Sequence, residues 1–276
     1  IKKILRIIIS VIFSFKYFNN HLVFVSIPFK KNIEIILKNK EKISIKRNHF
    51  PLYVELFQKG FYYEKGYYIK NNIKYKMSDQ FILLEDFDKN YGIQNLQNKN
   101  VLDIGGLNGE TALFFVTEKK VKTIFVYEPV KENFELVLKN IKINNFEKNI
   151  LPYQKGVSNK NGFEIIQSDG KPGTGGFGMP GNKYSIKIPV ESWDTILERH
   201  KKDNIYLAKV DCEGGERYLI EANKELIKTI SNWVIETHSA EIEKNIIGLF
   251  ESLGYKKELK EEVNKKERVN MWYFYL

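Results

Sequence analysis

Short apolar runs and longer amphipathic segments alternate along the chain from about residue 100 onward. The apolar runs are NVLDIG, TIFVYE, ILPYQKGVS, IYLAKVD and NWVIETH. Segments with helical spacing lie between or after these runs, from about residue 108, over residues 131–145, over residues 215–228 and over residues 241–253. This alternation predicts a mostly parallel sheet with helices on both faces. The last run, VNMWYFYL, predicts a final antiparallel strand paired with one that contains residues 256–259.

The first third of the chain has a different pattern. Residues 42–75 alternate apolar and polar positions, with turns at Gly60, Gly66 and Asn71-Asn72, which predicts antiparallel hairpins. Residues 81–87 then predict a short apolar helix. We therefore expect two regions: a basic helical and hairpin region over residues 1–98, and the alternating α/β domain over residues 99–276.

Two apolar runs precede the hairpins, over residues 7–15 and 22–29. Each is less than half of the roughly 20 residues that a helix needs to cross a bilayer, so neither predicts a transmembrane helix. Lys16, Tyr17 and Phe18 stand where a secretion signal would have its small-residue cleavage site. The first run predicts a packed helix, with a helix facing a membrane interface as the alternative.

Composition narrows the class of protein. With 43% hydrophobic and 28% charged residues in 276, the chain is globular rather than disordered, collagen-like or a coiled coil. Its single cysteine, Cys212, excludes an internal disulfide and fits a reducing, cytoplasmic location.

The net charge of +10 is unevenly distributed. Residues 1–98 carry 17 Lys and Arg against 8 Asp and Glu, and residues 99–276 carry 27 against 26. The α/β domain is thus nearly neutral, which disfavours nucleic acid as its partner. The basic first third is compatible with peripheral contact to an anionic membrane, although a general bias toward Lys, Asn and Ile explains the charge equally well.

The chemistry of the domain is expected where its strands end, because open α/β sheets bind ligands there. The first strand ends in Asp103-Ile-Gly105-Gly-Leu-Asn108-Gly109. A dinucleotide fingerprint starting at Gly105 needs glycines at positions 107 and 110, which are Leu and Glu. The strand-end acid and tight turn instead suit a ligand with a cationic centre. Glu128 ends the second strand, 19 residues after Gly109, where a carboxylate can accept both hydroxyls of a ribose.

Three segments carry a resemblance to a known family: VLDIGGLNGETALFF, VYEPVKENFELVLKNIKINN, and AKVDCEGGERYLIEAN followed by WVIETH. Over about residues 77–255 the chain resembles the FkbM family of S-adenosylmethionine-dependent methyltransferases. Members commonly have Ala-Asn where Gly106 and Leu107 stand here. The resemblance implies a Rossmann-like, doubly wound, mostly parallel seven-stranded sheet with an antiparallel last strand. The pattern of residues 1–98 predicts a small N-terminal α+β appendage beside it.

The resemblance also implies how the cofactor, S-adenosylmethionine, is held. Asp103, Gly105 and Asn108 would surround its methionine part and Glu128 would hold its ribose. A loop over residues 156–158, at the end of the third strand, would lie against its adenine. The implied contacts are Asp103, Gly105, Asn108, Gly109, Glu128, Gly156, Val157 with Ser158, and Asp211.

Methyl transfer to a hydroxyl needs a group that removes the hydroxyl proton. The candidates end the fourth and fifth strands of the domain: Asp211, Glu213, Glu216, Glu236 and His238. His238 has an intrinsic pKa suited to a base, whereas its structural alternative is a cap on the strand end, and the alternative for Glu213 and Glu216 is helix capping. Asp211, Glu236 and His238 are also acceptable ligands for a divalent cation, but we favour a reaction without a metal.

The segment DGKPGTGGFGMPG, residues 169–181, separates two expected strands over residues 163–167 and 186–190. Asn182 follows Gly181 where a phosphate-binding loop would have Lys, so that reading is excluded. We expect a loop that covers the substrate, with an idle surface loop as the alternative.

The resemblance to the FkbM family implies an S-adenosylmethionine-dependent O-methyltransferase that acts on a sugar, a glycan or a lipid-linked saccharide. Two alternatives stay open from the sequence. One is a Rossmann-like oxidoreductase. The other is a noncatalytic module that binds an anionic membrane or nucleic acid through the basic first third.

Overall fold

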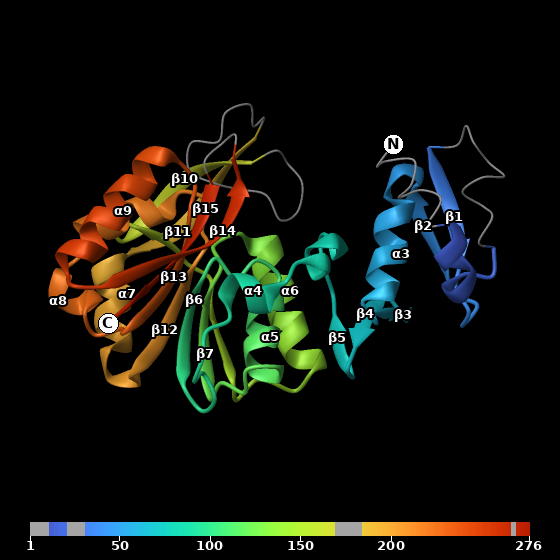
Figure 1. The fold of residues 1–276 in the computed structure, drawn as a ribbon, viewed down its shortest axis with the longest axis horizontal. Helices are drawn as coiled ribbons and strands as arrows, with labels where there is room; N and C mark the ends of the chain where they lie inside the picture. Colours follow the sequence, from blue (N-terminus) through green and yellow to red (C-terminus); the bar gives the residue numbers. More distant parts are fainter. Residues whose placement is uncertain (1–10, 21–30, 169–183, 266–268) are drawn as a thin grey trace. The chain divides into compact units, whose positions relative to one another are not determined.

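The computed structural model describes residues 11–20, 31–168, 184–265 and 269–276. The chain forms two compact units, Ile1–Glu85 and Asp86–Leu276, which are described separately below (Figure 1). The expected covering loop over residues 169–181 and the apolar run over residues 22–29 lie outside the described residues. No helix of the described residues is long and apolar enough to cross a membrane.

The division between the units falls 13 residues before the expected boundary at Asn98, because helix α4 (Phe87–Tyr91) and the segment after it belong to the second unit. This division sharpens the charge distribution. Residues 1–85 carry 16 Lys and Arg against 6 Asp and Glu, whereas residues 86–276 carry 28 of each. The whole net charge of +10 therefore lies in the first unit.

The first unit combines short helices with two small antiparallel sheets. After a helix over residues 11–17, its elements are β1 (Asn32–Ile36), β2 (Lys42–Lys46), η1 (Arg47–His49), α3 (Phe50–Gln58), β3 (Tyr62–Glu64), β4 (Tyr67–Lys70), β5 (Ile73–Tyr75) and η2 (Gln80–Leu84). β1 pairs with β2, and β4 lies between β3 and β5. The antiparallel hairpins expected over residues 42–75 are confirmed except at α3.

Helix α3 corrects the expectation of strands alone between residues 42 and 75. Pro51 stands in its first turn, where a missing N–H costs nothing. Phe50, Tyr53, Val54 and Phe57 recur at helical spacing and are buried together, so packing on one face of a helix outweighs the alternating pattern around it.

The second unit contains the expected seven-stranded sheet (Figure 1). Its strands are β6 (Asn100–Ile104), β7 (Thr123–Tyr127), β8 (Ile150–Tyr153), β12 (Ile205–Val210), β13 (Asn232–Thr237), β14 (Lys256–Asn264) and β15 (Val269–Tyr275). The order is β14-β15-β13-β12-β6-β7-β8, and β15 runs antiparallel to both of its neighbours. The doubly wound, mostly parallel sheet and the antiparallel last strand are thus confirmed, including the pairing of residues 256–259 with that strand.

Helices cover both faces of this sheet. They are α5 (Glu110–Thr117), α6 (Lys131–Ile143), α7 (Trp193–His200), α8 (Lys224–Ile227) and α9 (Ala240–Ser252), with the 3₁₀ turns η3 (Lys201–Asp203) and η4 (Gly215–Glu221). Figure 1 shows α7, α8 and α9 on one face and α5 and α6 on the other. Trp193, Trp233 and Phe250 anchor the core beneath α7–α9, and all three are almost completely buried. α7 was not expected, and the single helix expected over residues 215–228 is instead η4 followed by α8.

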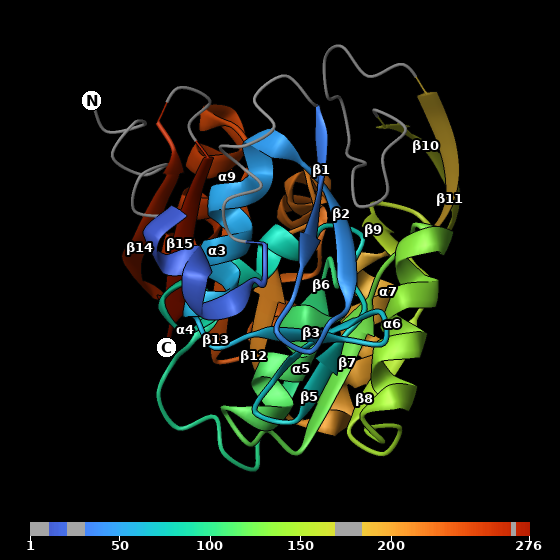
Figure 2. The same ribbon diagram turned by 90° about the vertical axis from the view of Figure 1, so that its right-hand side faces the viewer.

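A second, three-stranded sheet stands beside the large one (Figure 2). It consists of β9 (Gly156–Ser158), β10 (Gly162–Ser168) and β11 (Tyr184–Ser192), in the order β10-β11-β9. The strands expected over residues 163–167 and 186–190 are confirmed. The run ILPYQKGVS, expected as one strand, divides into β8 and β9, so residues 156–158 form a strand rather than a loop.

The strand order reverses between β6 and β12. From β6 the chain proceeds outward through β7 and β8, and then it returns to β12 and proceeds the other way through β13. The crevice at the carboxyl ends of β6 and β12 is the place where such sheets bind ligands. The residues that end β6, β7, β12 and β13 therefore define the candidate site.

Candidate active site

The glycine turn after β6 is packed too tightly for side chains. Gly105 and Gly109 have φ values of 86° and 80°, a region that glycine adopts without strain. A Cβ at Gly105 would lie 1.7 Å from the carbonyl oxygen of Asp211, which follows β12. The N–H groups of Gly105 and Gly106 donate to the carbonyl oxygen of Tyr127 at the end of β7. The turn thus packs the carboxyl ends of β6, β7 and β12 against one another.

Leu107 marks the departure from the family pattern. It has a φ of 46°, in the left-handed region where Asn is better tolerated than Leu. Glu128 holds it there, because its Oε2 accepts a hydrogen bond from the Leu107 N–H at 2.9 Å. The turn therefore keeps its shape through Glu128, although the residue at position 107 is unfavourable.

Glu128 is buried at the end of β7 and is bound to backbone on both oxygens. Oε1 accepts from the N–H of Val130 at 2.8 Å and from Asn133 Nδ2 at 3.3 Å. Burial raises the pKa of Glu128 to about 7, against the lowering effect of these donors. A carboxylate offers about four acceptor positions, and Oε2 uses one of its two, so one acceptor position on Oε2 is left. Its use by a ribose hydroxyl stays a prediction.

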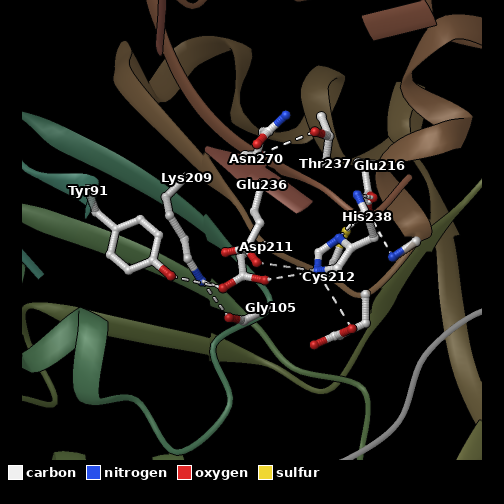
Figure 3. Close-up of polar contacts among 12 residues, drawn as sticks. Tyr91, Gly105, Lys209, Asp211, Cys212, Glu216, Glu236, Thr237, His238 and Asn270 are labelled. Atoms are coloured by element: carbon white, nitrogen blue, oxygen red, sulfur yellow. Dashed lines mark hydrogen bonds and ion pairs between the residues drawn. The ribbon is translucent and has the colours of Figure 1, made fainter. Parts of the chain in front are cut away.

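Lys209 is a residue of the site that the sequence did not reveal as such. It lies within β12 and is 2% exposed. Its Nζ is 3.0 Å from Asp103 Oδ1. The same atom donates to the carbonyl oxygen of Gly105 at 2.6 Å (Figure 3). Burial disfavours its charge, but the carboxylates of Asp103 and Asp211 outweigh burial and raise the pKa of Lys209. The sequence does place this charged residue within the apolar strand IYLAKV. Because a buried charge needs a partner of opposite charge, that position could have indicated an ion pair.

Asp211 joins this ion pair to the group of acids around His238. Its Oδ2 accepts from the Tyr91 hydroxyl at 2.9 Å and lies 4.0 Å from Lys209 Nζ. Its Oδ1 lies 3.8 Å from His238 Nε2. Tyr91 comes from α4, far from the strand ends in sequence, so no local pattern pointed to it. Figure 3 shows these side chains converging between β6, β12 and β13.

His238 follows β13 and is surrounded by carboxylates. Its Nδ1 is 3.0 Å from Glu216 Oε1, and its Nε2 is 3.6 Å from Glu213 Oε2 and 3.7 Å from Glu236 Oε1. Burial lowers its pKa, but the hydrogen bond to Glu216 and the charges of Glu216, Asp211 and Glu213 outweigh burial and raise the pKa to about 10. His238 is thus an imidazolium at neutral pH. The predicted role as a base assumed the ordinary pKa of a histidine, which is 6.5, and the surrounding carboxylates raise that pKa.

Glu216 positions this histidine. Its side chain has no exposed surface, and its Oε1 also accepts from the His238 N–H at 3.1 Å while Oε2 accepts from the Gly214 N–H at 2.9 Å. The capping alternative is thus partly correct for Glu216. Its carboxylate accepts a hydrogen bond from the turn before η4 and another from the imidazole of His238. Burial raises the pKa of Glu236 to about 9, which makes this carboxyl neutral at pH 7.

The same group contains the donor atoms for a cation. Within the described residues, Asp211, Glu213 and His238 offer ligand atoms that all lie within 4.8 Å of one another. A divalent cation at this place would have to displace the second proton of His238. A proton and a metal ion are therefore alternative ways to neutralise the same carboxylates.

The structure brings the predicted catalytic residues together and distributes the predicted cofactor residues around the glycine turn. Asp103 and Asn108 have no exposed surface, so a direct contact of either with the cofactor stays a prediction. A Cβ at Gly156 would lie 3.2 Å from Pro129, the residue after Glu128, and one at Gly215 would lie 2.9 Å from Val157. Residues 156–157, predicted to lie against the adenine, thus border Pro129 and the first residue of η4.

Glu110, the first residue of α5, gives a prediction about pH. It is buried, and burial raises its pKa from the ordinary 4.5 of a glutamate to about 8. The folded chain keeps this proton up to about pH 8, whereas the unfolded chain loses it near pH 4.5, so the free energy of unfolding falls as the pH rises between these values. We expect Glu110→Gln to raise the free energy of unfolding at about pH 8.5 by about 1–3 kcal/mol.

Urea unfolding at about pH 8.5 and about pH 4 measures this effect. The variant and the wild type should differ at the higher pH and converge at the lower one, where Glu110 is protonated in both states. An equal difference at both pH values would show that the effect is not due to ionisation.

The seven-stranded, mostly parallel sheet with the glycine turn at its reversal of strand order defines a Rossmann-like domain. Residues 103–257, more than half of the chain, match the family model described as the methyltransferase FkbM domain. The chain therefore belongs to the FkbM family of methyltransferases, and the domain is that of an S-adenosylmethionine-dependent methyltransferase. The match is not to an oxidoreductase family.

Solved structures are similar to the second unit in fold. A methyltransferase FkbM from Methylobacillus flagellatus is 20% identical, with a TM-score of 0.50, and the match covers 69% of this chain and 48% of that one. TrmK from M. capricolum, solved with S-adenosyl-homocysteine, is 13% identical, with a TM-score of 0.42 and coverage of 69% and 68%. The chain thus spans about half the length of the first of these proteins. Among curated protein sequences, none matches this chain.

Proposed function

We propose that the second unit transfers the methyl group of S-adenosylmethionine to a hydroxyl of a sugar, a glycan or a lipid-linked saccharide. The observation that carries this proposal is the group of Asp211, Glu213, Glu236 and His238, which lies beside the glycine turn at the reversal of strand order. Such a group can take up a proton next to a bound cofactor, and a hydroxyl is the nucleophile that needs this help.

The reaction is a displacement at carbon. The acceptor oxygen forms a bond to the methyl carbon, the carbon–sulfur bond breaks, and its electron pair stays on sulfur, which leaves as a neutral thioether. The hydroxyl proton must pass to the protein. Holding the two reactants in line supplies much of the acceleration, and the proton acceptor adds about 10²–10⁴-fold.

Asp211 and Glu213 are the expected proton acceptors. Their side chains are 25% and 43% exposed, whereas Glu216 is fully buried and Glu236 is neutral at pH 7. The imidazolium of His238 faces both carboxylates and holds them toward one point. His238 is thus proposed to act together with its carboxylates rather than as the base alone.

We propose a reaction without a metal, since the imidazolium already supplies positive charge among the carboxylates. Turnover is expected to be unchanged by EDTA and not to depend on added Mg²⁺ or Mn²⁺. Loss of turnover in EDTA, restored by one of these ions, would favour the cation alternative at Asp211, Glu213 and His238.

The proposed function is tested with methyl-¹³C-labelled S-adenosylmethionine and a panel of saccharides and lipid-linked saccharides. Formation of S-adenosyl-homocysteine shows turnover, and NMR of the product locates the label. We expect the label on an oxygen. A label on nitrogen or carbon would contradict hydroxyl methylation, and turnover only with acceptors that are not saccharides would contradict the proposed acceptor class.

Cofactor binding is expected to depend on Glu128. Replacing it with alanine removes the acceptor for the ribose and releases the Leu107 N–H, so the dissociation constant for S-adenosylmethionine should rise about 10–100-fold. Isothermal titration calorimetry measures this change. Glu135→Ala, which removes an exposed carboxylate from α6, is the matched control and should bind as the wild type does. Equal affinities of the two variants would exclude Glu128 from the cofactor site.

A further inference from the structure

The helix over residues 11–17 in the first unit exposes three apolar side chains and buries a polar one. Ile12, Phe13 and Phe15 are 65%, 47% and 64% exposed, whereas Ser14 is completely buried. The Ser14 hydroxyl donates to the carbonyl oxygen of Val11 at 2.7 Å. A helix at the surface of a globular protein normally buries its apolar face, whereas this helix exposes apolar side chains, which is typical of a docking surface.

Packing fixes the orientation of this helix within its unit. Val11 and Tyr17 contact the core, and Phe18, directly after the helix, is fully buried. The Tyr17 ring stacks on Phe57 with centroids 5.8 Å apart. The Lys38 N–H donates to the Tyr17 carbonyl oxygen, which joins the helix end to the turn between β1 and β2. The outward face therefore cannot turn inward without breaking this core.

Exposed lysines lie beside the apolar face. Lys16 lies on the same outward arc of the helix, and Lys38 Nζ lies 5.7 Å from the centroid of the Phe15 ring. Lys40 is exposed in the same turn as Lys38. The unit as a whole carries +10, whereas the second unit is neutral. Apolar side chains among cations match the boundary between the headgroups and acyl chains of an anionic bilayer.

We propose that this face, formed by Ile12, Phe13 and Phe15 with Lys16 and Lys38, docks the protein on an anionic lipid membrane. The apolar side chains enter the headgroup region, and the ammonium groups meet the lipid phosphates. The helix does not need to span the bilayer for this. Nucleic acid explains the charge, and its bases can stack on phenyl rings, but it offers no apolar layer for Ile12, so the bilayer fits both observations. The inference concerns the first unit and goes beyond the methyl transfer proposed for the second.

Cosedimentation of the whole chain with vesicles tests the proposal. Binding is expected to vesicles of phosphatidylcholine with phosphatidylserine, to weaken with added NaCl, and to be weak with phosphatidylcholine alone. The variant I12S/F13S/F15S is expected to lower the partition coefficient about tenfold or more. The matched control L138S/F163S/I165S removes three apolar side chains of similar exposure from the neutral unit and should bind as the wild type does.

Charge is tested in the same way. Lys16→Glu with Lys38→Glu is expected to lower binding to the phosphatidylserine vesicles about tenfold, and Lys202→Glu with Lys256→Glu in the second unit is the control with equal charge change. Circular dichroism and binding of S-adenosylmethionine verify that each variant is folded, and they separate this test from that of the methyltransferase.

Three outcomes would overturn the proposal. The first is equal vesicle binding by I12S/F13S/F15S and its control. The second is an effect of these substitutions on the oligomeric state without vesicles, which would assign the face to a second copy of the chain. The third is tight binding to nucleic acid with none to the anionic vesicles.

Discussion

Alanine in place of His238 is expected to lower turnover about 10²–10⁴-fold while the affinity for S-adenosylmethionine stays within about twofold of the wild type. The imidazolium lies 3.6–3.8 Å from the carboxyl groups of Asp211, Glu213 and Glu236. Without it, the carboxylates of Asp211 and Glu213 repel each other, and the group that receives the acceptor proton loses its geometry. The glycine turn and Glu128 keep their own contacts, so cofactor binding should persist. Single-turnover kinetics and calorimetry measure the two quantities separately.

His238→Asn is the variant that separates catalysis from folding. The Asn amide can still donate to Glu216, as Nδ1 does, but nothing replaces Nε2 among the other carboxylates. We expect it to fold with a stability near that of the wild type and to share the turnover defect of the alanine variant. Wild-type turnover in His238→Asn would remove Nε2 from the mechanism. Loss of cofactor binding in His238→Ala would place the residue in the cofactor site instead.

Replacing Lys209 with methionine is expected to destabilise the second unit by about 3–5 kcal/mol. Methionine fills similar space but leaves Asp103, which has no exposed surface, without its partner at 3.0 Å. Breaking a buried ion pair from one side costs this much because the remaining charge stays buried. Urea unfolding measures the change, and Lys202→Met on the surface should stay within about 0.5 kcal/mol of the wild type.

The double variant Asp103→Asn with Lys209→Met shows whether charge is the cause. It removes both members of the pair, so most of the lost stability should return. If the double variant is as unstable as Lys209→Met, the loss is due to the hydrogen bond to Gly105 or to packing, and the ion pair is not what stabilises the turn.

The fold of the second unit was predictable because its signal is local and repeated. Each buried parallel strand is a short apolar run, and each covering helix has its own period, so the order of elements follows from the sequence. In contrast, α3 and α7 lie in segments whose hydrophobic pattern is alternating or mixed. Tertiary burial, rather than the local pattern, determines that these segments are helices. Phe50–Gln58 shows this, because the residues that make it a helix are those that the core of the first unit covers.

The positions of the site residues were predictable, but their protonation states were not. Strand ends pointed to Asp211, Glu236 and His238, and the structure places them together. The raised pKa of His238 depends on Glu213 and Glu216, which reach it only through the turn at Gly214 with its φ of 101°. Lys209, two residues before Asp211, lies near its carboxylate, and Tyr91 of α4 donates a hydrogen bond to it. The spacing of these residues in the sequence does not predict either contact.

Calorimetric titration of the whole chain with S-adenosylmethionine tests the central claim most directly. We expect saturable one-to-one binding that S-adenosyl-homocysteine displaces, and we expect Glu128→Ala to weaken it while Glu135→Ala does not. No detectable binding at millimolar cofactor, with the protein shown to be folded, would contradict the assignment of the glycine turn and Glu128 to this cofactor.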